Sequence, residues 1–225
     1  MTEEYKVTIK KSKRKTASIY IERDGSVSVL VPENLDQTQI EELLNANEYK
    51  IYKFQAKRSL LNENAVKREP VNGQSYLYLG RNYYLQYSDE VEKIEFRGRY
   101  FYAPKGSSQK LKELFKEFYR TRAKKYLQSR VDMFADMLGV TVDEIAIFEL
   151  KNRWASCSTI KPKINFNWKI MMAPASVINY LIVHELTHLI YKRHNADFWN
   201  TVDKIFPEYQ KQVTWLKQYG ASLDM

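Results

Sequence analysis

The sequence predicts an α+β protein in which a strand-rich N-terminal region precedes a mostly helical domain. Two stretches, 5–31 and 75–103, alternate apolar and polar residues in the manner of strands. The later part of the chain instead repeats its apolar residues at helical spacing. A polar break at 104–108, Pro-Lys-Gly-Ser-Ser, separates the two patterns. We therefore expect domains over residues 1–105 and 106–225.

The N-terminal region is expected to contain a sheet, one helix and a second sheet. In the first strand-rich stretch, valines alternate over 27–31, and Asp24-Gly25 is a hairpin signal. Asp36 is the predicted N-cap of a helix over 36–58. Two turn signals divide the second strand-rich stretch, at 80–82 and 97–99.

The C-terminal domain is expected to begin with a long helix over 108–138, which Gly139 closes. Pro174 opens a second helix, at a position where its missing N–H does no harm. Two shorter helices follow, after Asn195 and after Pro207. Short strands are expected before the second helix, at 144–150, around Trp154 and at 163–167.

Composition is that of an ordinary globular protein. The 225 residues are 44% hydrophobic, which is enough for one core or two small ones. With 7 Gly, 6 Pro and 1 Cys, collagen-like, low-complexity and disulfide-stapled classes are excluded. The N-terminus has no signal-peptide pattern, and the longest nearly apolar run, at 170–183, is too short to span a bilayer. We expect a cytoplasmic protein without a membrane partner.

The chemistry is concentrated in the three histidines of the chain, His184, His188 and His194. The first two belong to an H-E-x-x-H motif, in which the imidazoles lie roughly 40° apart around a helix and roughly 6 Å apart along it. They can therefore hold one ion, with Glu185 placed to act on a water. Two neutral imidazoles that bind Zn²⁺ beside such a carboxylate are typical of a hydrolase, because the metal lowers the pKa of water to about 7.

The H-E-x-x-H motif does not fix the position of the third histidine. A straight helix would carry His194 about 15 Å along the axis from the first ligand, so the helix must break after about Tyr191. In the metzincin pattern a Gly makes this turn, at the position that Tyr191 occupies here. Lys192, Arg193 or Asn195 would have to absorb the turn, and Asn tolerates the left-handed conformation best. From the residues alone, whether His194 reaches the metal stays open.

A structural explanation of the histidines is also available, since histidines on an exposed helix need no function. The segment 177–189, however, is apolar nearly all round, which predicts a buried helix. A buried Glu and paired His without a purpose would cost several kcal/mol. A structural zinc site usually has four ligands with Cys among them, so the pattern favours a catalytic metal.

Several motifs together resemble those of the YgjP-like metallopeptidases, relatives of the SprT-like and WLM zinc proteases. Arg-Trp-Ala-Ser-Cys at 153–157 corresponds to a family pattern R-W-G-S-C, with Ala155 in place of Gly. Asn-Trp at 167–168 supplies the middle element. The last element runs from His184 to Phe-Trp at 198–199. The resemblance covers nearly the whole chain. It implies a zincin-type α+β domain, His194 as the third zinc ligand, Glu185 as general base, and peptide hydrolysis.

The strand before the motif helix carries the candidate substrate contacts Arg153, Trp154 and Ser156. In zincins the strand beside the active helix commonly binds an extended substrate by strand addition, although the same segment can be an ordinary core strand. Cys157 can be read as a metal ligand, a redox latch or, as single cysteines more often are, a small buried apolar residue.

Other residues near the motif have two possible roles each. Arg153, Tyr180 and Tyr191 are candidates by sequence for stabilising an oxyanion. Asp197 can orient a metal-bound imidazole or, as we expect, cap the next helix. The pair Phe-Trp at 198–199 is expected to pack that helix against the active one.

The net positive charge of the chain raises the question of a nucleic-acid partner. The chain has 36 Lys and Arg against 27 Asp and Glu, a net +9, and the helix segment 110–130 holds 8 basic and 2 acidic residues. Such a stripe, like the basic run at 10–15, can follow a phosphate backbone, but it is more often a solvated face. The alternatives to a peptidase are therefore a nucleic-acid-binding module with a structural metal, and a zinc hydrolase of a non-peptide substrate. Glu185 argues against a structural metal, which needs no such carboxylate.

Overall fold

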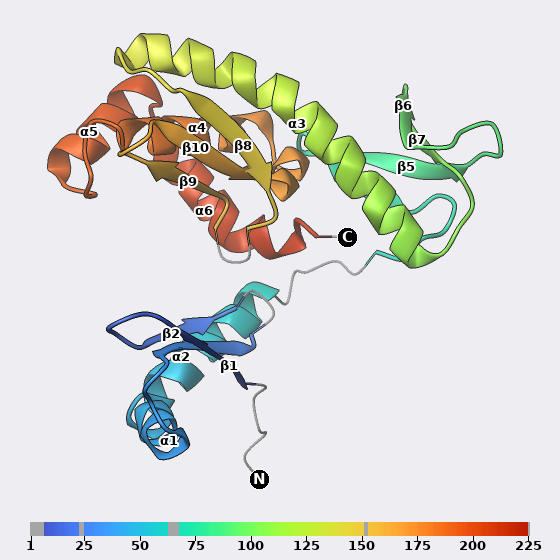
Figure 1. The fold of residues 1–225 in the computed structure, drawn as a ribbon. Coiled ribbons are helices and arrows are strands. Elements are labelled where there is room, and N and C mark those ends of the chain that lie inside the picture. Colours follow the sequence, from blue (N-terminus) through green and yellow to red (C-terminus); the bar gives the residue numbers. More distant parts are fainter. Residues whose placement is uncertain (1–6, 23–24, 63–67, 151–152, 225) are drawn as a thin grey trace. The chain divides into compact units, whose positions relative to one another are not determined.

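The computed structural model describes residues 7–22, 25–62, 68–150 and 153–224 (Figure 1). Two compact units divide the chain, Met1–Ala65 and Val66–Met225. Both helices and sheets occur, and the strand-rich part comes first, so the predicted α+β class is confirmed.

The N-terminal unit is a three-stranded sheet followed by two helices. Strands β1 (Val7–Ser12), β2 (Ser18–Ile21) and β3 (Val27–Pro32) lie in the order β1-β3-β2, with β1 parallel and β2 antiparallel to the central strand. The alternating valines of β3 are fully buried, and Ile40 and Ile51 from the helices complete this core. The predicted strands are therefore present. Asp24 of the predicted hairpin signal lies outside the described residues, and its neighbour Gly25 has a φ of +87°.

One helix was expected after the first sheet, and two are present, α1 (Gln37–Ala46) and α2 (Glu48–Asn62). Asp36 is the N-cap of α1 and forms a capping box with Gln39, as its residue type predicts. Asn47 separates the two helices, and its side-chain amide donates to the Leu43 carbonyl at 2.8 Å. An Asn that bonds to the backbone in this way competes with the helical pattern, which is why apolar spacing alone did not reveal the break.

The second unit begins with a four-stranded sheet of order β4-β5-β7-β6. Its strands are β4 (Ser75–Tyr78), β5 (Arg81–Tyr87), β6 (Glu95–Arg97) and β7 (Tyr100–Ala103). The two predicted turns are present, and each contains a glycine with positive φ, Gly80 at +78° and Gly98 at +59°. Glycine fits these turns because it lacks the Cβ that disfavours the left-handed conformation.

Helix α3 (Ser108–Leu138) joins this sheet to the rest of the unit, and it begins and ends as the sequence predicts. Ser107 caps its start, and Gly139 closes it in the left-handed conformation. Phe115 stacks on Tyr76 of β4, with ring centroids 4.4 Å apart, and Tyr119 donates a hydrogen bond of 2.6 Å to the Leu77 carbonyl. The division of the structure therefore differs from the expected boundary near residue 105. The polar break at 104–108 only turns the chain, whereas buried contacts join the sheet to α3.

The remaining elements form a third sheet and the helices that cover it. Strands β8 (Glu144–Phe148), β9 (Ala155–Ser158) and β10 (Lys163–Asn167) lie in the order β8-β10-β9, with β9 an antiparallel edge strand. The short helix η1 (Trp168–Met172) leads into α4 (Ala175–Thr187), and α5 (Ala196–Ile205), α6 (Tyr209–Tyr219) and η2 (Gly220–Ser222) follow. Helix α4 contacts α3, α5, α6 and β9, which explains why it is apolar nearly all round. Among the helices described, none combines the length and apolar character needed to cross a bilayer.

The turn between β4 and β5 fixes the four-stranded sheet to η1 and the start of α4. The backbone N–H groups of Leu79 and Gly80 donate to the carbonyls of Met171 and Met172, at 2.8 and 3.1 Å. A Cβ at Gly80 would lie 2.8 Å from the Cα of Pro174, which precedes the first residue of α4.

The Gly80→Ala variant is therefore expected to lower the free energy of unfolding by about 3 kcal/mol, the sum of a left-handed backbone and a core clash. Chemical denaturation of the purified protein measures this. Gly98→Ala is the matched control, because Gly98 has a similar φ of +59° but no atom within 4 Å of the added Cβ. In the control, the free energy of unfolding is expected to fall by about 1 kcal/mol. Equal losses in the two variants would show that the contact with Pro174 has no effect.

Candidate metal centre

The H-E-x-x-H motif lies at the C-terminal end of α4, and the chain turns sharply after it. The α-helix ends at Thr187, and the N–H groups of His188 and Leu189 donate to carbonyls three residues earlier, at 3.2 and 3.0 Å. Such bonds tighten the last turn of a helix. The break thus comes somewhat earlier than the position near Tyr191 that the sequence suggested. None of the described residues from 188 to 195 has a positive φ, so the turn needs no left-handed Asn195.

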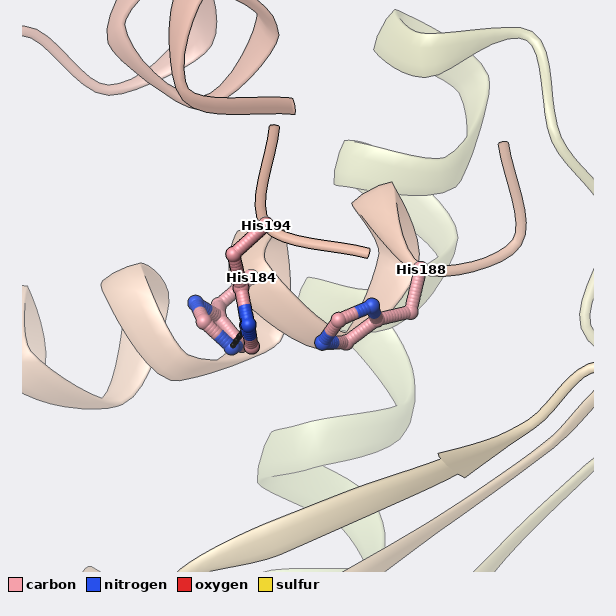
Figure 2. Close-up of side chains that lie close together, drawn as sticks. All are labelled: His184, His188 and His194. Carbon is pink, nitrogen blue, oxygen red and sulfur yellow. Dashed lines mark hydrogen bonds between the residues drawn. The ribbon is translucent and has the colours of Figure 1, made fainter. Parts of the chain in front are cut away.

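This turn brings the third histidine back to the first two. Figure 2 shows the imidazole rings of His184, His188 and His194 pointing toward one another. One ligand nitrogen of each ring lies within 4.8 Å of those of the other two, and the Nε2 atoms of His184 and His194 are 3.1 Å apart. His194 therefore lies within reach of an ion held by the other two histidines, which the residue spacing alone left open.

Neighbouring groups orient two of the rings. The Nδ1 atom of His188 is 3.1 Å from the Tyr191 carbonyl oxygen, which can only accept, so this nitrogen carries the proton. The Nδ1 atom of His184 is 3.4 Å from the Tyr180 hydroxyl. Hydrogen bonds at Nδ1 leave the Nε2 lone pair available for a metal and fix the ring orientation.

The donor set fits a zinc ion. Zinc binds histidine nitrogens at about 2.0–2.1 Å in tetrahedral sites, which places two ligand nitrogens about 3.3 Å apart. The observed 3.1 Å between His184 and His194 is close to this value. Burial, with smaller contributions from His188 and His194, lowers the pKa of His184 to about 3, so its imidazole is neutral as a ligand must be. Over the part of the chain that is described, no cysteine or carboxylate joins the group, and a fourth position is left for water or substrate.

Glu185 directly follows His184 on α4 and is buried, with 7% of its surface exposed. Burial raises the pKa of its carboxyl group to about 7, and the charge of Arg153 and a hydrogen bond from the Cys157 backbone partly oppose this effect. The bond to Cys157 ties the carboxylate to the edge strand β9. The group is therefore held in one place and is suited to accept and release a proton near neutral pH.

The candidate substrate contacts on and before β9 are not all directed at the histidines. Ser156 pairs across the sheet with Asn165, whose side-chain amide donates to the Ser156 hydroxyl at 3.4 Å. The ring of Trp154 packs against Gly220, where an added Cβ would be 3.2 Å from it. Arg153 is the candidate whose charge acts on Glu185. A substrate role for these three residues stays a prediction.

The structure also separates the alternatives for the other residues near the motif. Burial, together with the charge of Glu185, raises the pKa of the Cys157 thiol to about 11, and among the described residues Cys157 does not join the three converging histidines, which favours its reading as a small, partly buried apolar residue. Tyr180 is buried and its hydroxyl lies 3.4 Å from Nδ1 of His184, so it is a neighbour of a candidate ligand. The expectation that Asp197 caps α5 is wrong, because Asn195 is the N-cap and accepts from the Phe198 N–H at 3.0 Å.

Aromatic rings surround the histidines. Phe198 is fully buried, and its ring centroid lies 4.7–5.0 Å from those of His184, His188 and His194. Trp199 stacks on His194, with centroids 5.4 Å apart and planes at 21°. The expected packing of Phe198 and Trp199 is therefore present, but it is made with the histidines themselves. Tyr209, which stacks on Trp199, could not be found from the sequence because it belongs to no motif.

The basic side chains of α3 are partly occupied by contacts of their own. Lys116 forms an ion pair of 2.8 Å with Glu149, and Arg120 donates to the Ile147 carbonyl at 3.3 Å. Two other arginines lie over aromatic rings of the same helix, Arg122 over Phe118 and Arg130 over Tyr126. Binding of nucleic acid by this helix stays a prediction.

Comparison with known proteins identifies the family to which this chain belongs. Two solved structures with partial similarity to this chain are metallopeptidase zymogens, abylysin of Pyrococcus abyssi and jannalysin of Methanocaldococcus jannaschii. The first is 24% identical, covers 40% of this chain and 95% of its own, and has a TM-score of 0.36. The second is 21% identical, covers 40% and 90%, and has a TM-score of 0.35. No curated protein matches significantly. Residues 15–219 match the model of the YgjP-like metallopeptidase domain, and the chain therefore belongs to the YgjP-like metallopeptidase family.

Proposed function

We propose that this metallopeptidase depends on zinc, holds the ion with His184, His188 and His194, and uses Glu185 as its general base. One observation carries the proposal: the three imidazoles converge, and the buried carboxyl group of Glu185 directly follows the first of them on α4. Two motif histidines alone would define an incomplete site. The return of His194 supplies the three-nitrogen set that catalytic zinc uses, with a position left open.

Zinc bound there would polarise a substrate carbonyl and lower the pKa of a water molecule. The side chain of Glu185 would accept a proton from that water and pass it to the leaving amine. A backbone hydrogen bond from Cys157 holds the carboxylate against β9, so proton transfer and substrate binding would occur side by side. The Nδ1 contacts of His184 and His188 would keep the rings in one orientation during the reaction.

We further propose that β9 binds the substrate as an added strand. The Asn167 N–H donates to the Trp154 carbonyl at 2.8 Å. Along an antiparallel ladder, residue pairs that exchange backbone hydrogen bonds alternate with pairs that do not. By this alternation Ser156 bonds to β10, while Ala155 and Cys157 direct their backbone groups away from it. The Cys157 N–H already donates to Glu185, so the Cys157 carbonyl and the backbone groups of Ala155 are the ones left for a peptide. An extended peptide can pair with this edge strand. Arg153 is the favoured side-chain contact, since Trp154 and Ser156 pack elsewhere.

Cleavage of a mixture of unfolded proteins, detected by mass spectrometry, tests the proposal. The zinc-loaded protein is expected to generate new peptide termini. A chelator should reduce the signal to background, and an equivalent of Zn²⁺ should restore it, because the three histidines bind the ion reversibly. Zinc binding without any cleavage would contradict peptidase activity and favour a non-peptide substrate. Failure to bind zinc would contradict the metal site itself.

A further inference from the structure

A column of near-parallel aromatic rings extends from the third candidate ligand to the C-terminal helix. His194 stacks on Trp199 of α5, at 5.4 Å between centroids and 21° between planes. Trp199 stacks on Tyr209 of α6, at 5.1 Å and 10°. Tyr209 in turn stacks on Tyr180 of α4, at 6.1 Å and 12°. Three helices thus contribute one ring each to a column that ends at His194.

The column closes on itself through the first candidate ligand. The Tyr180 hydroxyl is 3.4 Å from Nδ1 of His184, and Nε2 of His184 is 3.1 Å from Nε2 of His194. Five side chains therefore form a closed circuit: His194, Trp199, Tyr209, Tyr180 and His184. Among the described residues Tyr209 has no ring contact with either histidine of this circuit, and it stacks between Trp199 and Tyr180, the two rings that do.

We propose that Tyr209 is a positioning residue for the metal centre. It holds Trp199 against His194 and Tyr180 against His184, so that the two Nε2 atoms stay at ligand spacing before an ion arrives. His194 needs such support because it is exposed and lies in the irregular connection between α4 and α5. If His194 became ordered only when metal binds, the entropy lost by its side chain and backbone would lower the metal affinity. The inference rests on the proposed zinc site.

The local backbone supports a specific role for Tyr209 in α6. Glu208, directly before it, has a φ of +60°, a conformation that a residue other than glycine adopts at some cost. This turn places Tyr209 at the first position of α6. The same helix carries a second aromatic pair, Trp215 and Tyr219, with centroids 5.4 Å apart. Tyr219 belongs to no ring contact with the histidines among the described residues, so it serves as the matched control.

The experiment compares Tyr209→Leu with Tyr209→Phe and Tyr219→Leu. Each variant is purified without metal, and its dissociation constant for Zn²⁺ is measured by competition with a chromophoric chelator. Loss of groups that orient zinc ligands typically weakens metal affinity by about 10–100-fold, and we expect a change of this size for Tyr209→Leu. Tyr209→Phe keeps the ring and is expected to rescue the affinity to within about twofold of the native protein, well below that range.

Two further measurements separate positioning from simple stabilisation. Denaturation of the metal-free variants shows how much general stability each Leu substitution removes. The Co²⁺ absorption spectrum reports the coordination geometry, which a purely structural residue would leave unchanged. We expect an altered spectrum for Tyr209→Leu alone. If this variant does not fold, Tyr209→Met keeps apolar volume without a ring and is tested in the same way.

The outcomes distinguish this inference from the function on which it rests. Native protein that binds no zinc would overturn the proposed function. Native protein that binds zinc, together with a Tyr209→Leu or Tyr209→Met variant of unchanged affinity and spectrum, would overturn the positioning role alone. A loss of affinity in Tyr219→Leu equal to that in Tyr209→Leu would also overturn it, because the effect would then belong to α6 as a whole.

Discussion

Replacing Glu185 with Gln is expected to lower kcat for peptide cleavage by about 10²–10⁴-fold, the usual contribution of a positioned acid or base. The amide has nearly the same shape as the carboxyl group and can accept the same backbone hydrogen bond from Cys157. It carries no charge into the buried site, so folding should be retained. Because Glu185 is not among the three converging nitrogen ligands, zinc binding should persist. Single-turnover assays on zinc-loaded enzyme, with metal content measured in parallel, test this.

A matched control for this variant is Glu144→Gln on β8. Glu144 is exposed and pairs with Lys163 at 2.8 Å, so its neutralisation removes a surface ion pair that contributes little. The control should keep full activity. A Glu185→Gln enzyme that turns over at the native rate would show that another group takes the proton. A variant that also loses its zinc would leave the base unassigned and make Glu185 part of the metal-binding shell.

The parts of the site that follow from helix geometry could be predicted from the sequence. Residues four apart on a helix share one face, so the pairing of His184 and His188 needed no tertiary information. The N-cap at Asp36 and the C-terminal Gly139 followed in the same way from local backbone chemistry. His194 is different, because its position depends on the path of an irregular connection. Only the family resemblance favoured it as a ligand before the fold was known.

What the sequence did not reveal involves contacts between distant segments. Alternation predicts a strand but does not say which helix covers it, so from the sequence the polar break at 104–108 indicates a domain boundary. The buried stacking of Tyr76 on Phe115 instead places that sheet and α3 in one core. Tyr209 was missed for a similar reason. A tyrosine in an amphipathic C-terminal helix carries no local sign that it lies within a column of rings ending at His194.

Replacing His184 with Ala is expected to abolish the stabilisation that zinc gives to the native protein. A ligand that binds only the folded state contributes about 2.7 kcal/mol at a concentration 100 times its dissociation constant. With one of three nitrogen donors missing, the same zinc concentration should give almost none. Thermal denaturation with and without Zn²⁺ measures the difference. The ring of His184 also packs against that of Phe198, with centroids 5.0 Å apart, so its truncation should lower the stability of the metal-free protein as well.

The His194→Ala variant separates the two effects, because His194 is exposed while His184 is not. Both variants should lose the response to zinc, whereas His184→Ala should show the greater loss of metal-free stability. A His194→Ala protein that keeps the native zinc response would limit the site to His184 and His188. That result would also contradict the positioning role of Tyr209, because His194 would then not be a ligand. A His184→Ala protein with its full metal content would instead contradict the ligand assignment at the centre of the proposed function.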